Sequence, residues 1–217
     1  MVEPPIHIYD TMTRRKKPFK PLNPPTVTMY VCGPTVYGDP HIGNLRTFTL
    51  GDLIRRWLEY RGYWVKYVMN ITDIEDKTIR DSAAAGKTLK EFTDYYTGVF
   101  FRALDLLSIK RATAHPRATE YVPQMIELIE KLMEKGAAYE AEDGVYFDID
   151  KFPRYGKLSG VDLGKVKRTE RVAADDYAKE DAQDFVLWKK STPEGLERGI
   201  YYESPWGRGR PGWHIEC

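Results

Sequence analysis

The sequence predicts an α/β fold: a Rossmann-like parallel sheet with a small β-containing connective insertion. Three observations predict it. An apolar, β-branched run at residues 27–32 ends at a Gly-Pro turn, an amphipathic helical pattern follows, and a second apolar run covers 64–71. This order of strand, helix and strand is that of a right-handed βαβ unit. After residue 136 the helical periodicity gives way to short apolar runs around a hairpin-like turn.

The individual elements follow from local patterns. Residues 12–25 contain four prolines and are expected to be irregular, because proline fixes φ and lacks an N–H donor. Apolar residues recur at helical spacing in 44–61, and Gly62 suits the end of that helix. Further helices are expected at 73–85, 89–107 and 120–135. Thr88 and Glu91 predict a capping box at the start of the third of these four helices.

The last third of the chain differs in texture. Glu142-Asp143-Gly144 lies between apolar residues and predicts a hairpin, whereas residues 151–182 are rich in Gly, Lys and Asp and suit a solvated surface. We therefore divide the chain into a first half of the Rossmann-like domain at 1–136, an insertion at about 137–200 and a return to the first domain at 201–217. Residues 213–217 are expected to form a sheet strand, and the domain is expected to be truncated there, because a strand needs a covering element.

Bulk composition excludes several classes of protein. The chain has 217 residues, 42% of them hydrophobic, which suffices for one sizeable core. Lys and Arg number 33 against 32 Asp and Glu, so the net charge of +1 argues neither for nor against nucleic acid. No secretory signal and no run of about 20 apolar residues occurs, which predicts a cytoplasmic protein with no membrane partner. Oligomeric state does not follow from the sequence.

The only cysteines are Cys32 and Cys217. Two thiols cannot make a disulfide scaffold in a chain of this size. In a reducing cytosol they are buried small apolar residues, part of a metal site, or catalytic thiols. Burial is the commonest of the three.

The segment 32–44 follows the first strand and leads into the first helix, where open α/β sheets bind ligands. The helix that begins near Asn44 offers free backbone N–H groups to an anion, and His41 beside it suits a polyphosphate. Gly43 has no side chain, so a flat group such as adenine could approach the backbone. Neither G-x-G-x-x-G nor a P-loop is present. His41 alone would be most simply a helix cap, but its neighbours Pro40, Gly43 and Asn44 favour function.

These residues carry a family resemblance. Residues 40–44 resemble the His-Ile-Gly-His signature of class I aminoacyl-tRNA synthetases, and residues 30–37 resemble the lead-in of the cysteinyl-tRNA synthetase family. Segments 70–77, 155–160, 184–189 and 211–217 resemble further motifs of that family in the same order. The resemblance covers residues 30–217, and several ordered motifs are far more specific than any one alone.

The resemblance implies a set of site residues. Cys32 and Cys217 would ligate one Zn²⁺, completed by a later His and Glu, and zinc would distinguish the cysteine thiolate from a serine hydroxyl. Gly33, Thr72 and Trp213 would contact the substrate cysteine, although Thr72 and Trp213 could equally be packing residues. The ATP-binding residues, with Mg²⁺ accompanying ATP, would be Pro34, Thr35, His41, Gly43 and Asn44; of these His41 and Asn44 would be catalytic.

The implied reaction is ATP-dependent activation of L-cysteine and its transfer to tRNA(Cys). The chain departs from the signature at Asn44, which replaces His and cannot carry a positive charge. The family's Lys-Met-Ser-Lys-Ser motif does not occur. We therefore expect these 217 residues alone neither to activate cysteine efficiently nor to charge tRNA. The alternatives are a cysteine ligase with an amino-sugar acceptor, a nucleotidyltransferase, and a non-catalytic nucleotide- or tRNA-binding fragment.

Overall fold

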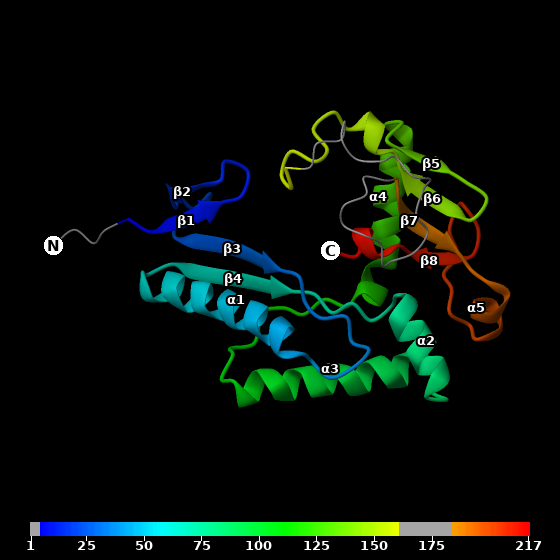
Figure 1. Ribbon diagram of the computed structural model, residues 1–217, viewed down its shortest axis with the longest axis horizontal. Coiled ribbons are helices and arrows are strands. Elements are labelled where there is room, and N and C mark those ends of the chain that lie inside the picture. Colours follow the sequence, from blue (N-terminus) through cyan, green and yellow to red (C-terminus); the bar gives the residue numbers. More distant parts are fainter. Residues whose placement is uncertain (1–4, 161–183) are drawn as a thin grey trace.

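The computed structural model describes residues 5–160 and 184–217 (Figure 1). Its strands are β1 (His7–Asp10), β2 (Arg15–Pro18), β3 (Thr26–Val31), β4 (Trp64–Met69), β5 (Ala138–Glu140), β6 (Gly144–Phe147), β7 (Phe185–Lys190) and β8 (Gly209–Pro211). Its α-helices are α1 (Ile42–Tyr60), α2 (Asp76–Ala84), α3 (Leu89–Leu106), α4 (Val122–Glu134) and α5 (Pro193–Glu197). The described residues also form the short 3₁₀ helices η1 (Ala118–Tyr121), η2 (Ile149–Lys151) and η3 (Trp213–Ile215). Among the described residues, none of the helices combines the length and apolar character needed to cross a membrane.

The predicted βαβ unit is confirmed. Strands β3 and β4 pair in parallel from Thr26 opposite Trp64 to Val31 opposite Met69, and α1 connects them. A third extended segment lies beside β4, where Ala114 and other residues of 113–118 exchange backbone hydrogen bonds with it. The three form a parallel α/β sheet, the fold class that the sequence predicts.

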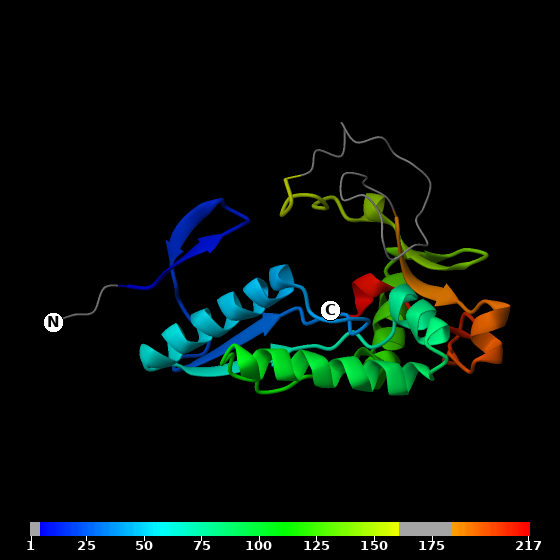
Figure 2. The same cartoon turned by 60° about the horizontal axis from the view of Figure 1, so that its bottom comes forward.

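Helices α1 and α3 pack together against this sheet (Figure 2). Phe48 of α1 meets Phe100 of α3 edge to face, with ring centroids 5.2 Å apart. Tyr67, Met69 and Ile71 supply the sheet side of the same core, and all three are 1% exposed. The capping box predicted at the start of α3 is also confirmed, because the Thr88 N–H donates to Glu91 and the Glu91 N–H donates to Thr88.

A second, antiparallel sheet has the order β5-β6-β7-β8. The predicted hairpin is present as β5 and β6, and the second core lies between this sheet and α4, with Ile129 and Trp188 fully buried. Strand β8 is part of this sheet, although it belongs to the segment 201–217. The prediction of a strand at residues 213–217 is wrong: Trp213–Ile215 forms η3, and Ile215 packs against the second core.

The prediction that residues 12–25 are irregular is also wrong in part. Strand β2 pairs with β1 as an antiparallel hairpin. The Asp10 carboxylate accepts hydrogen bonds from the Met12 N–H and the Thr13 hydroxyl and so closes the turn. Pro18 is tolerated because it stands at the end of an edge strand, where its missing N–H costs little.

Polar contacts join α2 to the second sheet and to the segment after α5. Asp76, the first residue of α2, accepts from Lys189 of β7 at 2.6 Å and from Arg210 of β8. Arg198 donates to the carbonyl oxygen of Ile79 and to the Ser82 hydroxyl of the same helix. These polar contacts fix α2 against β7, β8 and Arg198.

Candidate functional site

The site lies beyond the carboxyl ends of β3 and β4, where the parallel pairing continues into the loops. The Val36 N–H donates to the carbonyl oxygen of Thr72 at 3.1 Å, and the Thr72 N–H donates to that of Pro34 at 3.0 Å. Gly33 lies against this pairing: a Cβ atom there would stand 1.7 Å from the Asn70 carbonyl oxygen. Only glycine therefore fits this close approach of two backbones.

A buried polar network holds the loops together. Asn70 and Thr72 are 4% and 3% exposed. The Asn70 side-chain oxygen accepts from the Gly33 N–H at 2.7 Å, and its amide nitrogen donates to the Thr72 hydroxyl at 3.3 Å. Because this bond uses the Thr72 oxygen as an acceptor, the Thr72 proton is directed elsewhere.

His41 is the N-cap of α1, as the simpler alternative for that residue predicts. Its Nδ1 accepts from the Gly43 N–H at 3.1 Å, and the Asn44 side-chain oxygen accepts from the His41 N–H at 3.2 Å. The two side chains form a reciprocal capping box. His41 Nε2 and the Asn44 amide nitrogen are not used by this box, so the cap leaves one polar end of each exposed side chain for a ligand.

The two cysteines, from opposite ends of the chain, come together. Cys32 directly follows β3 and Cys217 follows η3, and the two side chains lie close enough to influence each other's protonation. Burial and this contact with Cys32 raise the pKa of the Cys217 thiol. Burial, followed by the nearby charges of the two thiols, also raises the pKa of the Tyr30 phenol. Of the three readings of the cysteines, this geometry favours a paired thiol site over separate burial, since both side chains are partly open to solvent.

A pair of converging thiols fits a soft divalent metal such as zinc, because each thiolate supplies one strong donor. The pair is half of a tetrahedral donor set. Across residues 5–160 and 184–217 no group of three or more His, Cys, Asp or Glu side chains is placed to hold a metal ion.

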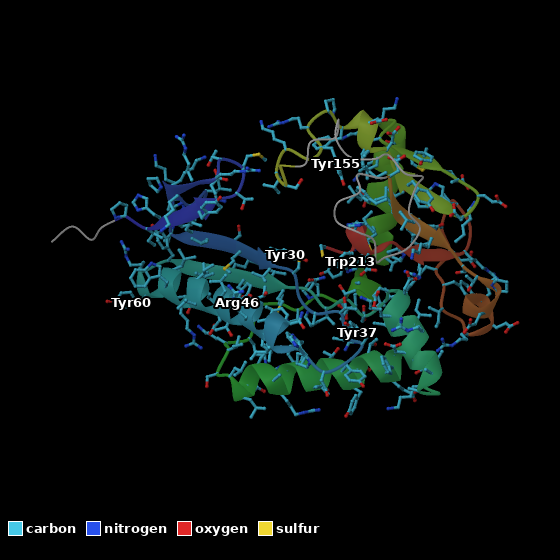
Figure 3. All side chains as sticks on the ribbon, in the orientation of Figure 1. Tyr30, Tyr37, Arg46, Tyr60, Tyr155 and Trp213 are labelled. Carbon is cyan, nitrogen blue, oxygen red and sulfur yellow. The ribbon has the colours of Figure 1, made fainter. Side chains whose placement is uncertain are left out.

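A cavity of about 270 Å³ opens between the loop after β3, α1, α3 and η3. Gly33, Pro34, Thr35, Asn44 and Trp213, all predicted from the sequence, line it. Figure 3 shows Tyr30, Tyr37 and Trp213 near the middle of the molecule, from β3, from the loop after it and from η3. Trp213 is 40% exposed, so its ring is available to a ligand rather than committed to a core.

The remaining predicted residues lie close by but do not line this cavity. Thr72 lies beneath it in the buried network, and His41 and Gly43 form the neighbouring helix cap. Pro40, which the sequence analysis named beside His41, also lines the cavity. Residues that the sequence reasoning did not single out complete the lining: Val36, Tyr37, Gly38, Asp39, Lys77, Tyr96 and Phe100. Most of these lie inside the recognised motifs and could have been found there, whereas Tyr96 and Phe100 reach the cavity only through the packing of α3.

The βαβ unit with a cavity at its carboxyl edge defines a Rossmann-like ligand-binding domain. Residues 18–217 match the family described as "tRNA synthetases class I (C) catalytic domain", and the chain belongs to this family.

The chain is similar to curated proteins named Cysteine--tRNA ligase. A Cysteine--tRNA ligase of Methanosarcina mazei is 59% identical over 212 residues, which are 98% of this chain and 45% of that protein. A Cysteine--tRNA ligase of Pyrococcus horikoshii is 48% identical, over 98% of this chain and 44% of its own length. The chain therefore spans less than half the length of these relatives. A solved Mycobacterium tuberculosis methionyl-tRNA synthetase in complex with methionyl-adenylate is 21% identical, with a TM-score of 0.49, over 52% of this chain and 23% of that chain.

Proposed function

We propose that the protein carrying this chain activates L-cysteine with ATP and transfers it to tRNA(Cys). The observation that carries the proposal is the thiol pair Cys32 and Cys217 beside a cavity at the strand ends, next to the N-terminus of α1. Relatives named Cysteine--tRNA ligase at 59% and 48% identity support it.

The reaction has two steps. An oxygen of the cysteine carboxylate attacks the α-phosphorus of ATP, the bond to the bridging oxygen breaks, and pyrophosphate leaves with that electron pair. A hydroxyl oxygen at the 3′ end of the tRNA then attacks the carbonyl carbon, the bond from that carbon to the phosphate oxygen breaks, AMP leaves with the electron pair, and the hydroxyl proton is released. The first step needs no proton transfer, so placement and charge neutralisation dominate the work of the protein.

The substrate cysteine would lie between the loop after β3 and η3. The Gly33 N–H is already bonded to Asn70, so Gly33 would contact the substrate through its carbonyl oxygen, which accepts from the α-ammonium group. The Thr72 hydroxyl, held by Asn70, would donate its proton. Trp213 would cover the substrate from η3.

Cys32 and Cys217 would hold a Zn²⁺ ion as thiolates. Bound zinc would supply selectivity for the thiolate of cysteine over the hydroxyl of serine, which shape alone separates by only about 1–3 kcal/mol. The raised pKa of Cys217 without metal means that zinc and the proton compete for its sulfur.

ATP, with Mg²⁺, would lie along the N-terminus of α1. His41 Nε2 and the Asn44 amide group would face its phosphates, while Gly43 leaves room for adenine at the helix. Pro34 and Thr35 would border the nucleotide from the loop after β3.

Cysteine-dependent exchange of pyrophosphate into ATP, measured with the complete gene product, tests the proposal. Exchange is expected with cysteine and not with serine. Replacing either Cys32 or Cys217 by Ser should remove the bound zinc and so abolish the exchange. Absence of cysteine-dependent exchange would refute the proposal. Residues 1–217 alone are expected to show little exchange, because the thiol pair and the signature helix make up only part of the site.

The acceptor distinguishes the closest alternative. A cysteine ligase that uses an amino sugar would show the same exchange reaction but would transfer cysteine to the sugar amine and not to tRNA. Incubating the complete protein with labelled cysteine, ATP and each acceptor in turn separates the two. A non-catalytic nucleotide- or tRNA-binding protein would show binding without exchange.

A further inference from the structure

The β1–β2 hairpin and the residues beside it concentrate positive charge. Residues 5–20 contain five Lys or Arg side chains and one acidic residue, whereas the whole chain has 33 and 32. The five basic residues are all exposed: Arg14, Arg15, Lys16, Lys17 and Lys20. A chain whose net charge is only +1 therefore contains a strongly basic surface.

Only one of these five cations has a carboxylate partner among the described residues. Asp10 pairs with Lys17 at 2.5 Å, and its carboxylate also closes the turn of the hairpin. Arg15, Lys16 and Lys20 form no ion pair with any side chain of residues 5–160 and 184–217. Their three charges face solvent and can meet an anionic partner.

The hairpin is anchored at both ends but buries neither face. The Phe19 ring after β2 meets the Tyr63 ring edge to face at 6.0 Å, and the Arg14 guanidinium at the turn lies against Gly160. Every residue of the two strands except Asp10 is exposed, and the hairpin stands clear of the β3–β4 pair in Figures 1 and 2. A two-stranded hairpin without a covering layer is marginally stable in water, so open faces on an anchored hairpin suit a binding partner.

An aromatic ring lies among the basic side chains. Tyr9 is 56% exposed and stands directly opposite Lys16 in the antiparallel register, so the two side chains share one face of the hairpin. Cations that pair with phosphates and a ring on which a base can stack are the combination by which proteins hold nucleic acid.

The proposed function supplies one large polyanion, the tRNA, whose 3′ end has to reach the cavity beyond β3. Strand β3 runs from the hairpin side to Cys32, so the hairpin belongs to the same layer as the site. We propose that the β1–β2 hairpin binds the phosphate backbone of tRNA through Arg15, Lys16 and Lys20. This inference rests on the proposed function. In the simpler alternative the three side chains only keep an exposed hairpin soluble.

The chain offers a matched control set on other elements. Arg102 of α3, Lys135 after α4 and Lys151 of η2 are one arginine and two lysines, as in the hairpin set. They are likewise exposed and form no ion pair with a described side chain. Replacing either set by Gln removes the same formal charge.

The test compares R15Q/K16Q/K20Q with R102Q/K135Q/K151Q in the complete gene product. Binding of a tRNA(Cys) transcript is measured by fluorescence anisotropy over a series of salt concentrations. We expect the hairpin variant to bind about 10-fold or more weakly, and the slope of log affinity against log salt to fall by about 2–3, since each lost phosphate contact removes roughly 0.7–0.9. The control variant should stay within about twofold of the unaltered protein. Equal weakening in the two variants, or an unchanged salt slope in the hairpin variant, would overturn the inference.

Kinetics distinguish an RNA contact from damage to the site. Pyrophosphate exchange needs no tRNA, so the hairpin variant should keep its exchange rate and its Tm while its KM for tRNA rises about 10-fold. A parallel fall in exchange and in tRNA charging would mean that the hairpin only supports the fold, and would overturn the inference.

The binding assay also separates this inference from the proposed function, because it needs no activation of cysteine. If the unaltered protein shows no exchange, the proposed function fails, but weaker tRNA binding by the hairpin variant than by the control variant still supports the contact. Vesicles that contain phosphatidylserine test the other polyanion. Loss of vesicle binding in the hairpin variant, with equal tRNA affinity in both variants, would assign the hairpin to a lipid surface and overturn the inference.

Discussion

The contact between Asp76 and the second sheet allows a quantitative prediction for Asp76→Asn. Asp76 accepts from Lys189 at 2.6 Å and from Arg210, whose side chains are 13% and 9% exposed. Breaking a fully buried pair costs about 3–5 kcal/mol, and breaking an exposed pair costs about 0–1 kcal/mol. Asp76 itself is 48% exposed, so after the substitution water can solvate part of the charge of the two cations. We expect the substitution to cost about 2 kcal/mol, between the two limits.

The assay is urea or thermal unfolding of residues 1–217. For a chain of this size, about 2 kcal/mol corresponds to a fall in Tm of about 4–8 °C. Asp105→Asn is the control, because Asp105 pairs with Arg111 at a similar 2.7 Å but both side chains are exposed, 58% and 44%. It should cost less than about 1 kcal/mol. Equal effects of the two substitutions would refute the argument that burial of the cations sets the cost.

Three further predictions follow from the site and the core. Gly33→Ala should cost about 3 kcal/mol in unfolding free energy, since its Cβ would stand 1.7 Å from the Asn70 carbonyl oxygen. Burial lowers the pKa of His115 below its usual 6.5, and its Nε2 accepts from the Ala112 N–H, so the folded chain keeps the neutral ring. Stability should therefore fall as pH drops below about 6.5, by at most about 1.4 kcal/mol per pH unit, and a His115→Asn variant should lack this decline. Asn44→Asp keeps the capping oxygen but replaces the amide donor by a negative charge, so calorimetry should show weaker ATP binding with Tm nearly unchanged.

The βαβ unit could be predicted because each of its elements has a strong local pattern. Helix α1 was expected at 44–61 and spans Ile42–Tyr60, and β4 was expected at 64–71 and spans Trp64–Met69. The third parallel segment near Ala114 was not predicted, since it contains Pro116 and pairs only through scattered backbone bonds.

The error at residues 213–217 has a tertiary cause. Trp-His-Ile-Glu-Cys alternates in the manner of a strand, and local pattern alone favours one. Strand β8, however, already pairs with β7, and the Gly212 N–H donates to the Leu187 carbonyl oxygen at the end of that pairing. Packing of Ile215 against the second core then turns the chain into η3. That turn carries Cys217 back toward Cys32, which no local pattern could show.

The cap of α1 explains how Asn44 can stand where the family signature has His. The capping box requires an acceptor at this position, because the His41 N–H would otherwise lack a partner. A ligand at the helix end requires a donor, since phosphate oxygens only accept. An amide group has one of each, so Asn44 meets both requirements with its two ends, as His41 does with its two ring nitrogens. The requirement that an amide cannot meet is charge. The change from His to Asn at the signature position therefore keeps the cap of α1 and a hydrogen-bond donor, and gives up a charge.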